Sequence, residues 1–342
     1  MKLDWRPFNL PLIAPFRISK GIFHERRAIV VKLQYDGQQG LGEATEITYY
    51  GKSIEAMLRE LENIGKQIND WEFEHPKLFY ERLSSKSKTD PFILSALDCA
   101  AYDLYGKLHH QNTREILEIQ HDQLGPPTSI TIGLGSEEEM VGSMIERPWP
   151  AYKVKLGQPD DIELMKALRR HTDSVLRVDA NGGWSIDECL EKIYALENLN
   201  VELIEQPMAP EQDGHLAKIK SMVDTPLVAD ESCQGPGDVQ SCQASYHGIN
   251  IKLMKCGGIT PAIQMISEAR DLGLQVMLGC MTESSVGISA AAQLIPLVDF
   301  VDLDGAMMLK SDIANGVTFQ DGHIKYTDLP GHGCDLKEQF QF

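Results

Sequence analysis

Three acidic residues in the middle of the chain each stand at the end of an apolar segment. They are Asp179 in VLRVDANGG, Glu205 in ELIEQP and Asp230 in PLVADES. Intervals of about 25 residues separate them, which leaves room for one strand, one helix and their loops. In a parallel barrel all strand ends of this kind open on one face, where such folds keep their active sites. We therefore expect the three carboxylates to be neighbours in space.

Three unpaired carboxylates in one place would repel one another unless a cation lies between them. A hard divalent cation accepts such oxygen ligands, and Mg²⁺ keeps further positions for water or substrate. We predict one Mg²⁺ per subunit on Asp179, Glu205 and Asp230, with Asn181 and Asn250 beside these ligands. The alternative is that each acid forms a buried ion pair with an inward-facing lysine or arginine.

Lysines stand on the segments that flank this acidic set: Lys153 and Lys155 in YKVKLG before it, and Lys252 in INIKLMK after it. Their alternation with apolar residues turns all three towards the barrel interior. Lys155 and Lys252 then stand on strands four apart in a ring of eight, on opposite sides of the mouth. Two opposed bases suit a proton swap at one carbon, because one removes the proton and the other delivers it from behind. Lys153, one layer deeper, would lower the pKa of Lys155 towards that of a working base. The alternative for each lysine is a solvated or ion-paired side chain.

The elements that must position these residues alternate strictly between strands and helices after Gly125-Pro126-Pro127. Strands are predicted at 128–134, 152–157, 175–181, 202–207, 226–231, 249–254, 275–280 and 301–305. Amphipathic segments predict helices at about 137–147, 160–171, 186–198, 213–222, 237–244, 261–272 and 284–296. Eight such β units favour a parallel (β/α) barrel, in the manner of a modified TIM barrel, over an open sheet.

The first third of the chain follows a different pattern. Segments 2–13, 27–35 and 40–45 are typical of an antiparallel meander, with a turn at Asp36-Gly37. Helical spacing follows at 53–68 and 91–108, and strands followed by helices favour a separate α+β unit. We predict a capping domain over 1–125, on which the tail 316–342 packs back, and a catalytic barrel domain over 126–315.

Five short motifs together resemble the enolase superfamily, in its muconate-lactonizing subgroup: KVK (153–155), DAN (179–181), EQP (205–207), ADES (229–232) and NIK (250–252). The resemblance covers nearly the whole chain, including ALDCAAYDLYGKL (96–108). It implies Mg²⁺-assisted removal of a proton next to a substrate carboxylate, with the developing ene-diolate stabilised by the cation. Members of this subgroup racemise, epimerise, eliminate or cycloisomerise, so the shared core does not name the substrate.

Two further carboxylates, Asp302 and Asp304 in VDLDGAMML, should face inward together on the last strand, far from the metal ligands. We interpret them as a receptor for an ammonium group several bonds from the substrate carboxylate; the alternative is a pair of hydrated acids at the barrel rim. An Asp-x-Asp at this place looks like the dipeptide epimerases, which implies that it binds the free amino group of a dipeptide. The resemblance of CMTESS (280–285) to the alanyl-glutamate epimerases implies that Thr131, Met281 and Thr282 line the pocket.

The predicted function is epimerisation at the α-carbon of the C-terminal residue of a dipeptide, with L-Ala-D/L-Glu as the favoured substrate. Lys20 in FRISKG falls about where the alanyl-glutamate epimerases carry an arginine for the glutamate side chain, and a lysine there is a point charge rather than a fork. Glu46 would oppose an acidic side chain. An apolar substrate side chain would instead suit four residues that lie close in sequence to Lys20 or Glu46: Ile22, Phe23, Tyr49 and Tyr50. The alternatives are a hydrophobic-dipeptide epimerase, an o-succinylbenzoate synthase or N-acylamino acid racemase, and a catalytically silent barrel that binds a metal-chelated anion.

Composition narrows the partners and the compartment. The formal net charge of −18 over 342 residues argues against nucleic acid and anionic membranes as partners, because both attract basic patches. The sequence shows neither a signal-peptide pattern nor an apolar run long enough to span a bilayer. Seven scattered cysteines without a CxxC pair are typical of reduced thiols, so we expect a cytoplasmic protein that binds a small molecule. Assembly into a homo-oligomer is possible by analogy with other barrels.

Overall fold

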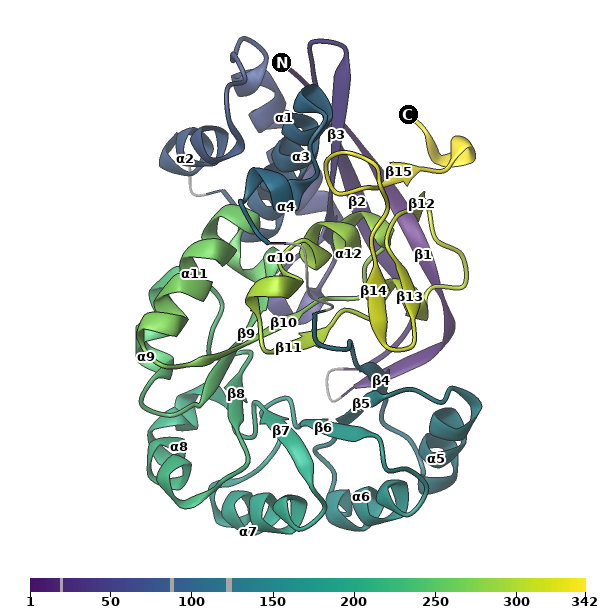
Figure 1. Cartoon of the computed structure of the whole chain (residues 1–342), viewed down its shortest axis with the longest axis vertical. Coiled ribbons are helices and arrows are strands. Elements are labelled where there is room, and N and C mark those ends of the chain that lie inside the picture. The colour runs from purple at the N-terminus through teal and green to yellow at the C-terminus, as the bar shows by residue number, and fades with distance from the viewer. Residues whose placement is uncertain (19–20, 87–88, 121–124) are drawn as a thin grey trace.

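The computed structural model describes residues 1–18, 21–86, 89–120 and 125–342. Its lower part is a parallel (β/α) barrel, and an α+β unit built from the N-terminal third sits above the barrel (Figure 1). Both parts were predicted from the sequence, and the predicted fold class is confirmed.

The barrel sheet holds eight parallel strands that lie side by side in chain order. They are β4 (Ile130–Ile132), β5 (Ala151–Lys155), β6 (Val175–Asp179), β7 (Val201–Glu205), β8 (Leu227–Ala229), β9 (Gly248–Lys252), β10 (Gln275–Gly279) and β11 (Phe300–Asp302). The two ends of the sheet meet where the Ser129 N–H donates to the Val301 carbonyl at 3.1 Å. The strands therefore wrap into a nearly closed ring.

Helices cover the outside of this ring. They are α5 (Glu137–Glu146), α6 (Asp161–Arg169), α7 (Ile186–Glu197), α8 (Asp213–Ile219), α9 (Val239–Cys242), α11 (Ile259–Asp271) and α12 (Ser285–Ala292), with the short α10 (Leu253–Cys256) directly after β9. The local sequence explains where two of these helices begin. Ser136 with Glu139, and Ser185 with Glu188, form capping boxes that satisfy free backbone N–H groups at the first turns of α5 and α7.

Several barrel strands end earlier than predicted, at the charged residue itself. After Asp179 and Glu205 the chain turns through Asn181 and Gln206, whose φ angles of 45° and 37° lie in the left-handed region. A strand cannot continue through such a conformation. The predicted strands 175–181 and 202–207 were therefore two residues too long, and the acids stand at the rim rather than inside the strands.

The N-terminal unit is a three-stranded antiparallel sheet with helices packed on it. Its elements are β1 (Lys2–Ile18), β2 (Gly21–Tyr35), β3 (Gln38–Thr45), α1 (Ile54–Ile68), α2 (Pro76–Lys86), α3 (Pro91–His109) and α4 (Thr113–Ile116). The β1–β2 hairpin extends further than predicted, with an irregular register between Pro11 and Phe16. This extension brings Phe16 and Ile18 to the mouth of the barrel.

Two buried acids of the N-terminal unit hold it on the barrel. Asp98 of α3 accepts hydrogen bonds from Thr260 N and Thr260 Oγ1, both at 2.8 Å, at the start of α11. Glu43 of β3 accepts from the N–H groups of Ser284 and Gly287, at 3.0 and 3.1 Å, at the start of α12. The amino-terminal ends of helices attract such anions. The cap is thereby fixed over the carboxyl ends of the strands.

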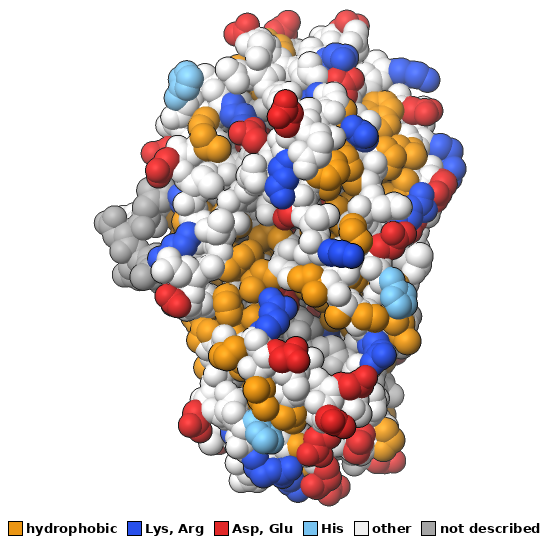
Figure 2. Space-filling view, turned by 90° about the vertical axis from the view of Figure 1, so that its right-hand side faces the viewer, with side chains coloured by type: hydrophobic (Ala, Val, Ile, Leu, Met, Phe, Trp, Pro, Cys, Tyr) orange, Lys and Arg blue, Asp and Glu red, His pale blue; other side chains and the backbone are white. Residues whose placement is uncertain are grey.

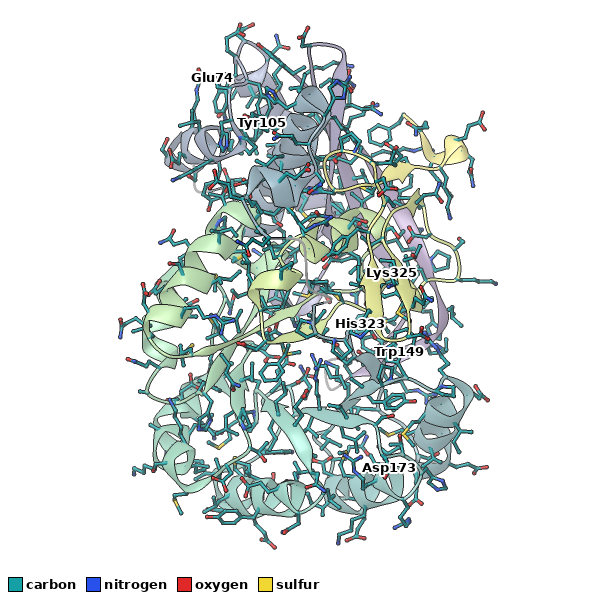
Figure 3. The ribbon with its side chains drawn as sticks, in the orientation of Figure 1. Glu74, Tyr105, Trp149, Asp173, His323 and Lys325 are labelled. Carbon is teal, nitrogen blue, oxygen red and sulfur yellow. The ribbon has the colours of Figure 1, made fainter. Side chains whose placement is uncertain are left out.

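The tail contacts both parts of the molecule through β12 (Ala314–Asn315), β13 (Thr318–Gln320), β14 (His323–Lys325) and β15 (Asp335–Leu336). The β13–β14 hairpin lies beside the segment that leads into β4, where His323 Nδ1 is 3.1 Å from the Gly125 carbonyl; Figure 3 shows His323 and Lys325 on this hairpin. Further along, Phe340 packs edge-on against Phe8 of the cap, with ring centroids 6.0 Å apart. The division into domains at 125 and 315 stays a prediction.

The face of the molecule turned to the viewer in Figure 2 carries acidic and basic side chains side by side, with hydrophobic side chains between them. Among the helices of the described residues, none combines the length and the apolar character that a bilayer crossing needs.

Candidate active site

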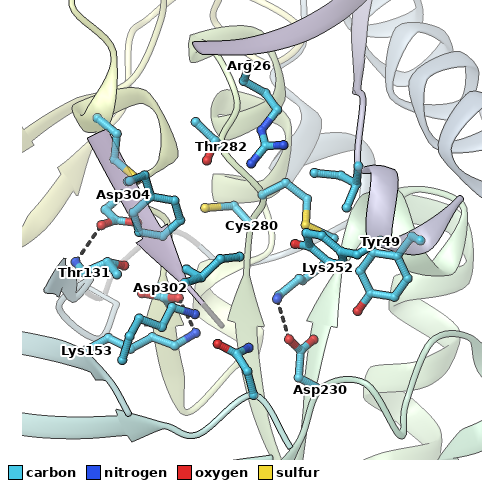
Figure 4. Close-up of a pocket in the computed structure, with 18 of the residues that line it drawn as sticks. Arg26, Tyr49, Thr131, Lys153, Asp230, Lys252, Cys280, Thr282, Asp302 and Asp304 are labelled. Carbon is cyan, nitrogen blue, oxygen red and sulfur yellow. Dashed lines mark hydrogen bonds and ion pairs between the residues drawn. The ribbon is translucent and has the colours of Figure 1, made fainter. Parts of the chain in front are cut away.

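A pocket opens between the carboxyl ends of the barrel strands and the loops of the cap (Figure 4). Ten of the predicted site residues line it: Thr131, Lys153, Lys155, Asn181, Asp230, Lys252, Met281, Thr282, Asp302 and Asp304. Asp179 and Glu205 lie just beneath, in contact with the lining residue Lys153, and Asn250 contacts Glu205. Lys20 lies outside the described residues. The pocket therefore gathers groups that are far apart in the sequence.

The three acids at the ends of β6, β7 and β8 are buried and paired with lysines. Asp179 Oδ2 lies 2.5 Å from Lys155 Nζ, and Asp230 Oδ2 lies 2.6 Å from Lys252 Nζ. Glu205 Oε1 accepts a hydrogen bond from Asn250 Nδ2 at 2.9 Å. Each of the three acids therefore has a lysine within ion-pair distance.

The charges of this cluster shift the acids in opposite directions. Burial disfavours the Asp179 carboxylate, but the ammonium groups of Lys155 and Lys153 outweigh it and lower the pKa of Asp179 to about 2. Burial, with the nearby charge of Asp179, raises the pKa of Glu205 to about 7. Glu205 is therefore much easier to protonate than Asp179.

Lys153 is the centre of the ion-pair network. Its Nζ lies 2.6 Å from Glu205, 2.8 Å from Asp302 and 3.2 Å from Asp179. Burial lowers the pKa of Lys153, but these carboxylates raise it well above its usual value. The effect predicted for Lys153 on Lys155 stays a prediction, and Lys153 itself has three carboxylate partners.

Lys155 and Lys252 stand on β5 and β9, with three strands between them, and both side chains reach the same pocket. Burial lowers the pKa of Lys252, while Asp230 and Glu205 raise it well above its ordinary value. In the arrangement described here Lys252 is therefore an ammonium group held by Asp230.

Two residues that were not predicted as site residues hold Asp230 in place. Lys255, on the turn of α10, sends its buried Nζ back to Asp230 Oδ1, to the Asp230 carbonyl at 2.6 Å and to the Cys233 carbonyl at 2.9 Å. Gln206 accepts the Asp230 N–H at 2.9 Å through its side-chain oxygen. Lys255 lies beyond the end of β9, in the short helix that starts at Leu253, and its side chain is buried there.

The described residues contain five buried side-chain oxygen or nitrogen atoms without a hydrogen-bond partner, and all five belong to this site. They are Arg26 Nε, Tyr50 Oη, Glu205 Oε2, Glu231 Oε2 and Asn250 Oδ1. Glu205 Oε2 has Lys153 at ion-pair distance but without the angle of a hydrogen bond. Buried polar groups are nearly always hydrogen-bonded, so such a cluster indicates a site that a ligand completes.

The acids fit a hard cation by their donor chemistry, because the atoms that they offer are all carboxylate oxygens and Glu205 Oε2 lacks a hydrogen bond. In the described ranges, no three acidic, histidine or cysteine side chains already converge on one point as metal ligands do. A cation would have to displace lysine contacts from Asp179 and Asp230.

Asp302 and Asp304 face the pocket as predicted, but they are not alike. Asp302 accepts from Ser129 Oγ at 2.6 Å and pairs with Lys153, which connects it directly to Glu205 and Asp179. It is therefore not remote from the acidic cluster, because one lysine side chain spans the distance. Asp304 Oδ2 accepts the Thr131 N–H at 2.7 Å, and burial beside Asp302 raises the pKa of Asp304 to about 6.

The cap contributes the roof of the pocket. Tyr49 and Tyr50 line it, whereas Ile22 and Phe23 do not. Glu46 points elsewhere: its Oε1 accepts the Ile54 N–H at 3.0 Å.

Arg26 is a lining residue that the sequence reading missed. Arg26 stands next to Arg27 on β2, and the sequence alone does not show which of the two arginines points inward. The register of the cap strands decides this, and it turns Arg26 to the pocket.

Comparisons with known proteins fit this geometry. Residues 136–340 match the family of enolase C-terminal domain-like proteins, and residues 6–117 match the N-terminal domain of the mandelate racemase and muconate lactonizing enzyme family. The chain belongs to the enolase superfamily. The resemblance read from the five motifs is thereby confirmed.

Enolase-superfamily relatives of this chain include several epimerases. An L-Ala-D/L-amino acid epimerase of Flavobacterium johnsoniae is 45% identical over 98% of this chain and 100% of the relative. An L-Ala-D/L-Glu epimerase of Bacteroides thetaiotaomicron is 36% identical over 97% of this chain and 87% of the relative. The solved dipeptide epimerase of Cytophaga hutchinsonii, complexed with Mg and D-Ala-L-Val, has a TM-score of 0.93 at 25% identity, over 99% of this chain and 96% of that one.

Proposed function

We propose that this protein is a magnesium-dependent dipeptide epimerase, an isomerase that inverts the α-carbon of the C-terminal residue of a dipeptide. The observation that carries the proposal is the joint placement of three groups in one pocket: the acids at the ends of β6 to β8, the opposed Lys155 and Lys252, and the pair Asp302 and Asp304. The epimerases among the relatives support it.

Asp179, Glu205 and Asp230 would hold the Mg²⁺. The bound ion would supply positive charge for the substrate carboxylate, whose negative charge grows as the α-proton leaves. Gln206 and Lys255 fix Asp230 from behind, and Asn250 fixes Glu205, so the protein sets the directions of the carboxylates in advance. Asn181 lies beside them, where its Nδ2 donates to Glu231 at 3.2 Å.

Lys155 and Lys252 would move the proton. One amine takes the α-proton from one face of the carbon, and the ammonium of the other returns a proton to the opposite face. Only a neutral amine accepts a proton, and each lysine is paired here with a carboxylate. We therefore also propose that these two ion pairs are broken when the enzyme has bound Mg²⁺ and substrate.

Asp302 and Asp304 would bind the free ammonium group of the dipeptide. Lys153 and Ser129 already engage Asp302, and Thr131 engages one oxygen of Asp304, so Asp304 keeps more capacity for a new donor. Met281 and Thr282 complete this side of the pocket. The span between the ammonium receptor and the acids of β6 to β8 then defines the length of the substrate backbone. We favour L-Ala-D/L-Glu as substrate, with a hydrophobic dipeptide as the alternative.

The direct test is a dipeptide library incubated with the enzyme and Mg²⁺ in D₂O, with mass shift and chiral separation as readouts. We expect α-deuterium and the second epimer at the C-terminal residue, and no exchange at the N-terminal residue. N-succinyl amino acids serve as the control class, because they lack the ammonium group that Asp302 and Asp304 would bind. Exchange with these compounds and with no dipeptide would falsify the proposal.

We include the cellular compartment and the division into domains in the same proposal. We place it in the cytoplasm, where its seven cysteines would stay free thiols. We also propose that residues 1–125 and 316–342 form the capping domain and that residues 126–315 form the catalytic barrel domain.

A further inference from the structure

Arg26 brings a guanidinium group into the roof of the pocket. Its side chain points from β2 of the cap down towards the cavity, near Thr282 (Figure 4), and only 5% of the residue is exposed. The guanidinium carbon lies 4.3 Å from the centroid of the Phe23 ring, and Nη1 donates to the Glu46 carbonyl at 3.2 Å. These contacts fix the direction of the group.

The charge of Arg26 has no acidic partner within ion-pair distance among the described residues, and its buried Nε lacks a hydrogen-bond partner. Its neighbour Arg27 shows the contrast, because it pairs with Glu46 at 3.3 Å and Glu55 at 2.8 Å. Another buried guanidinium, that of Arg177, has Glu202 at 2.6 Å. A buried charge without a partner is costly, so the surroundings of Arg26 are complete only when an anion is present.

We propose that Arg26 is the receptor for a negatively charged side chain on the residue that is epimerised, so that substrates ending in glutamate or aspartate are preferred. The assignment rests on the proposed function. The acids of β6 to β8 and the pair Asp302 and Asp304 already account for the α-carboxylate and the ammonium group of a dipeptide. The anion left for Arg26 is therefore the side chain of the C-terminal residue.

This assignment differs from the prediction that Lys20, which lies outside the described residues, selects the side chain. A guanidinium presents parallel N–H donors in a plane and binds a carboxylate through two hydrogen bonds, whereas an ammonium acts as a point charge. Glu46, expected to oppose an acidic substrate, turns its carboxylate to Ile54 and Arg27 and offers only its backbone carbonyl to Arg26.

The first experiment compares L-Ala-L-Glu with L-Ala-L-Gln on the unmodified enzyme. The two side chains have nearly the same shape, so they differ mainly in charge. We expect kcat/KM for the glutamate substrate to be at least about tenfold higher, since hydrogen bonds to a charged group are worth more than neutral ones. Equal values for the two substrates overturn the assignment.

The second experiment replaces the group. Arg26→Met should reduce the Glu-to-Gln ratio of kcat/KM at least about tenfold, mainly through KM, and Arg26→Lys should restore part of it. Arg27→Met is the matched control, an arginine of the same strand with its own acidic partners, and should leave the ratio unchanged. A role that is only structural would lower all substrates equally, and that result overturns the assignment.

The outcomes separate this inference from the proposed function. A wild-type enzyme that exchanges both dipeptides equally refutes the role of Arg26 and leaves the epimerase intact. An enzyme that exchanges no dipeptide refutes both. If Arg26→Met fails to fold, as judged from its thermal unfolding, the wild-type comparison of Glu with Gln still decides.

Discussion

Two ion pairs at the centre of the site each join a residue proposed to hold the metal with a residue proposed to move a proton. Asp179 pairs with Lys155, and Asp230 pairs with Lys252. These contacts hold the four side chains in place, and each contact must be released before its lysine can move a proton.

Lys155→Met and Lys252→Met are expected to abolish net epimerisation, with a loss of at least about a hundredfold, because each removes one proton-transfer group. Each variant should still exchange the α-proton of one epimer, and the two variants should retain opposite epimers. Exchange in D₂O, measured separately from the L- and the D-form, checks this. Full turnover in both directions by either variant contradicts the opposed arrangement.

Lys192→Met is the matched control for these lysine variants. Lys192 is also a buried lysine paired with an acid, Asp161 at 3.1 Å, but it lies on α7 outside the pocket. Its replacement should lower the thermal stability without changing which epimer loses its proton.

At the scale of elements, the site depends on two features: the turns after β6 and β7, and the contacts that hold the cap on the barrel. The turns after β6 and β7 force Asn181 and Gln206 into left-handed backbone, and this strain aims Asp179 and Glu205 at the rim. The cap, in turn, is held by Asp98 and Glu43, whose carboxylates sit at the first turns of α11 and α12. A barrel helix and a cap residue thus fix each other, and the roof of the pocket depends on these contacts.

Asp98→Asn should change how stability depends on pH. Burial raises the pKa of Asp98 to about 7, against hydrogen bonds from Thr260 that lower it. Between pH of about 4 and 7 the folded protein therefore binds more protons at this residue than the unfolded chain does, so its contribution to stability falls as pH rises. We expect the difference between the melting temperatures at pH 5 and pH 7.5 to shift in the variant towards greater relative stability at pH 7.5. An unchanged difference would show that Asp98 does not titrate in this range.

At the scale of the whole molecule, the net charge of −18 disfavours an anionic substrate, and the pocket corrects this locally. Lys153, Lys155, Lys252 and Arg26 all line it. The same global charge attracts cations in general, so an effect of Mg²⁺ on the protein is informative only when it depends on particular acids.

Mg²⁺ should raise the melting temperature, because a ligand that binds only the folded state stabilises it, by about 2.7 kcal/mol at a hundredfold excess over Kd. Removal of the ion with EDTA should reverse the shift. Glu205→Gln should fold but lose most of the Mg²⁺-dependent shift, while Glu202→Gln, an acid of the same strand that contacts Arg177, should keep it. A shift of equal size in both variants would mean that Mg²⁺ acts on the general surface charge.

The sequence by itself determined the barrel and the principal groups at its mouth. Alternation along strands and helices is a local property, so the period-two pattern placed Asp179, Lys155 and Lys252 on strand ends that face inward. Asp302 and Asp304 followed from the same pattern. The roles of these residues in catalysis stay proposals, whereas their placement in one pocket is a property of the structure.

Only the tertiary structure decided which charges meet. Whether Lys153 reaches Asp302 as well as Glu205, and whether Lys255 turns back onto Asp230, depends on side-chain reach across the ring rather than on spacing in the chain. The direction of Arg26 depends on the register of two cap strands and on the way the cap sits on α11 and α12. These are long-range contacts, which local periodicity does not encode, and they fix the part of the site that we propose selects the substrate.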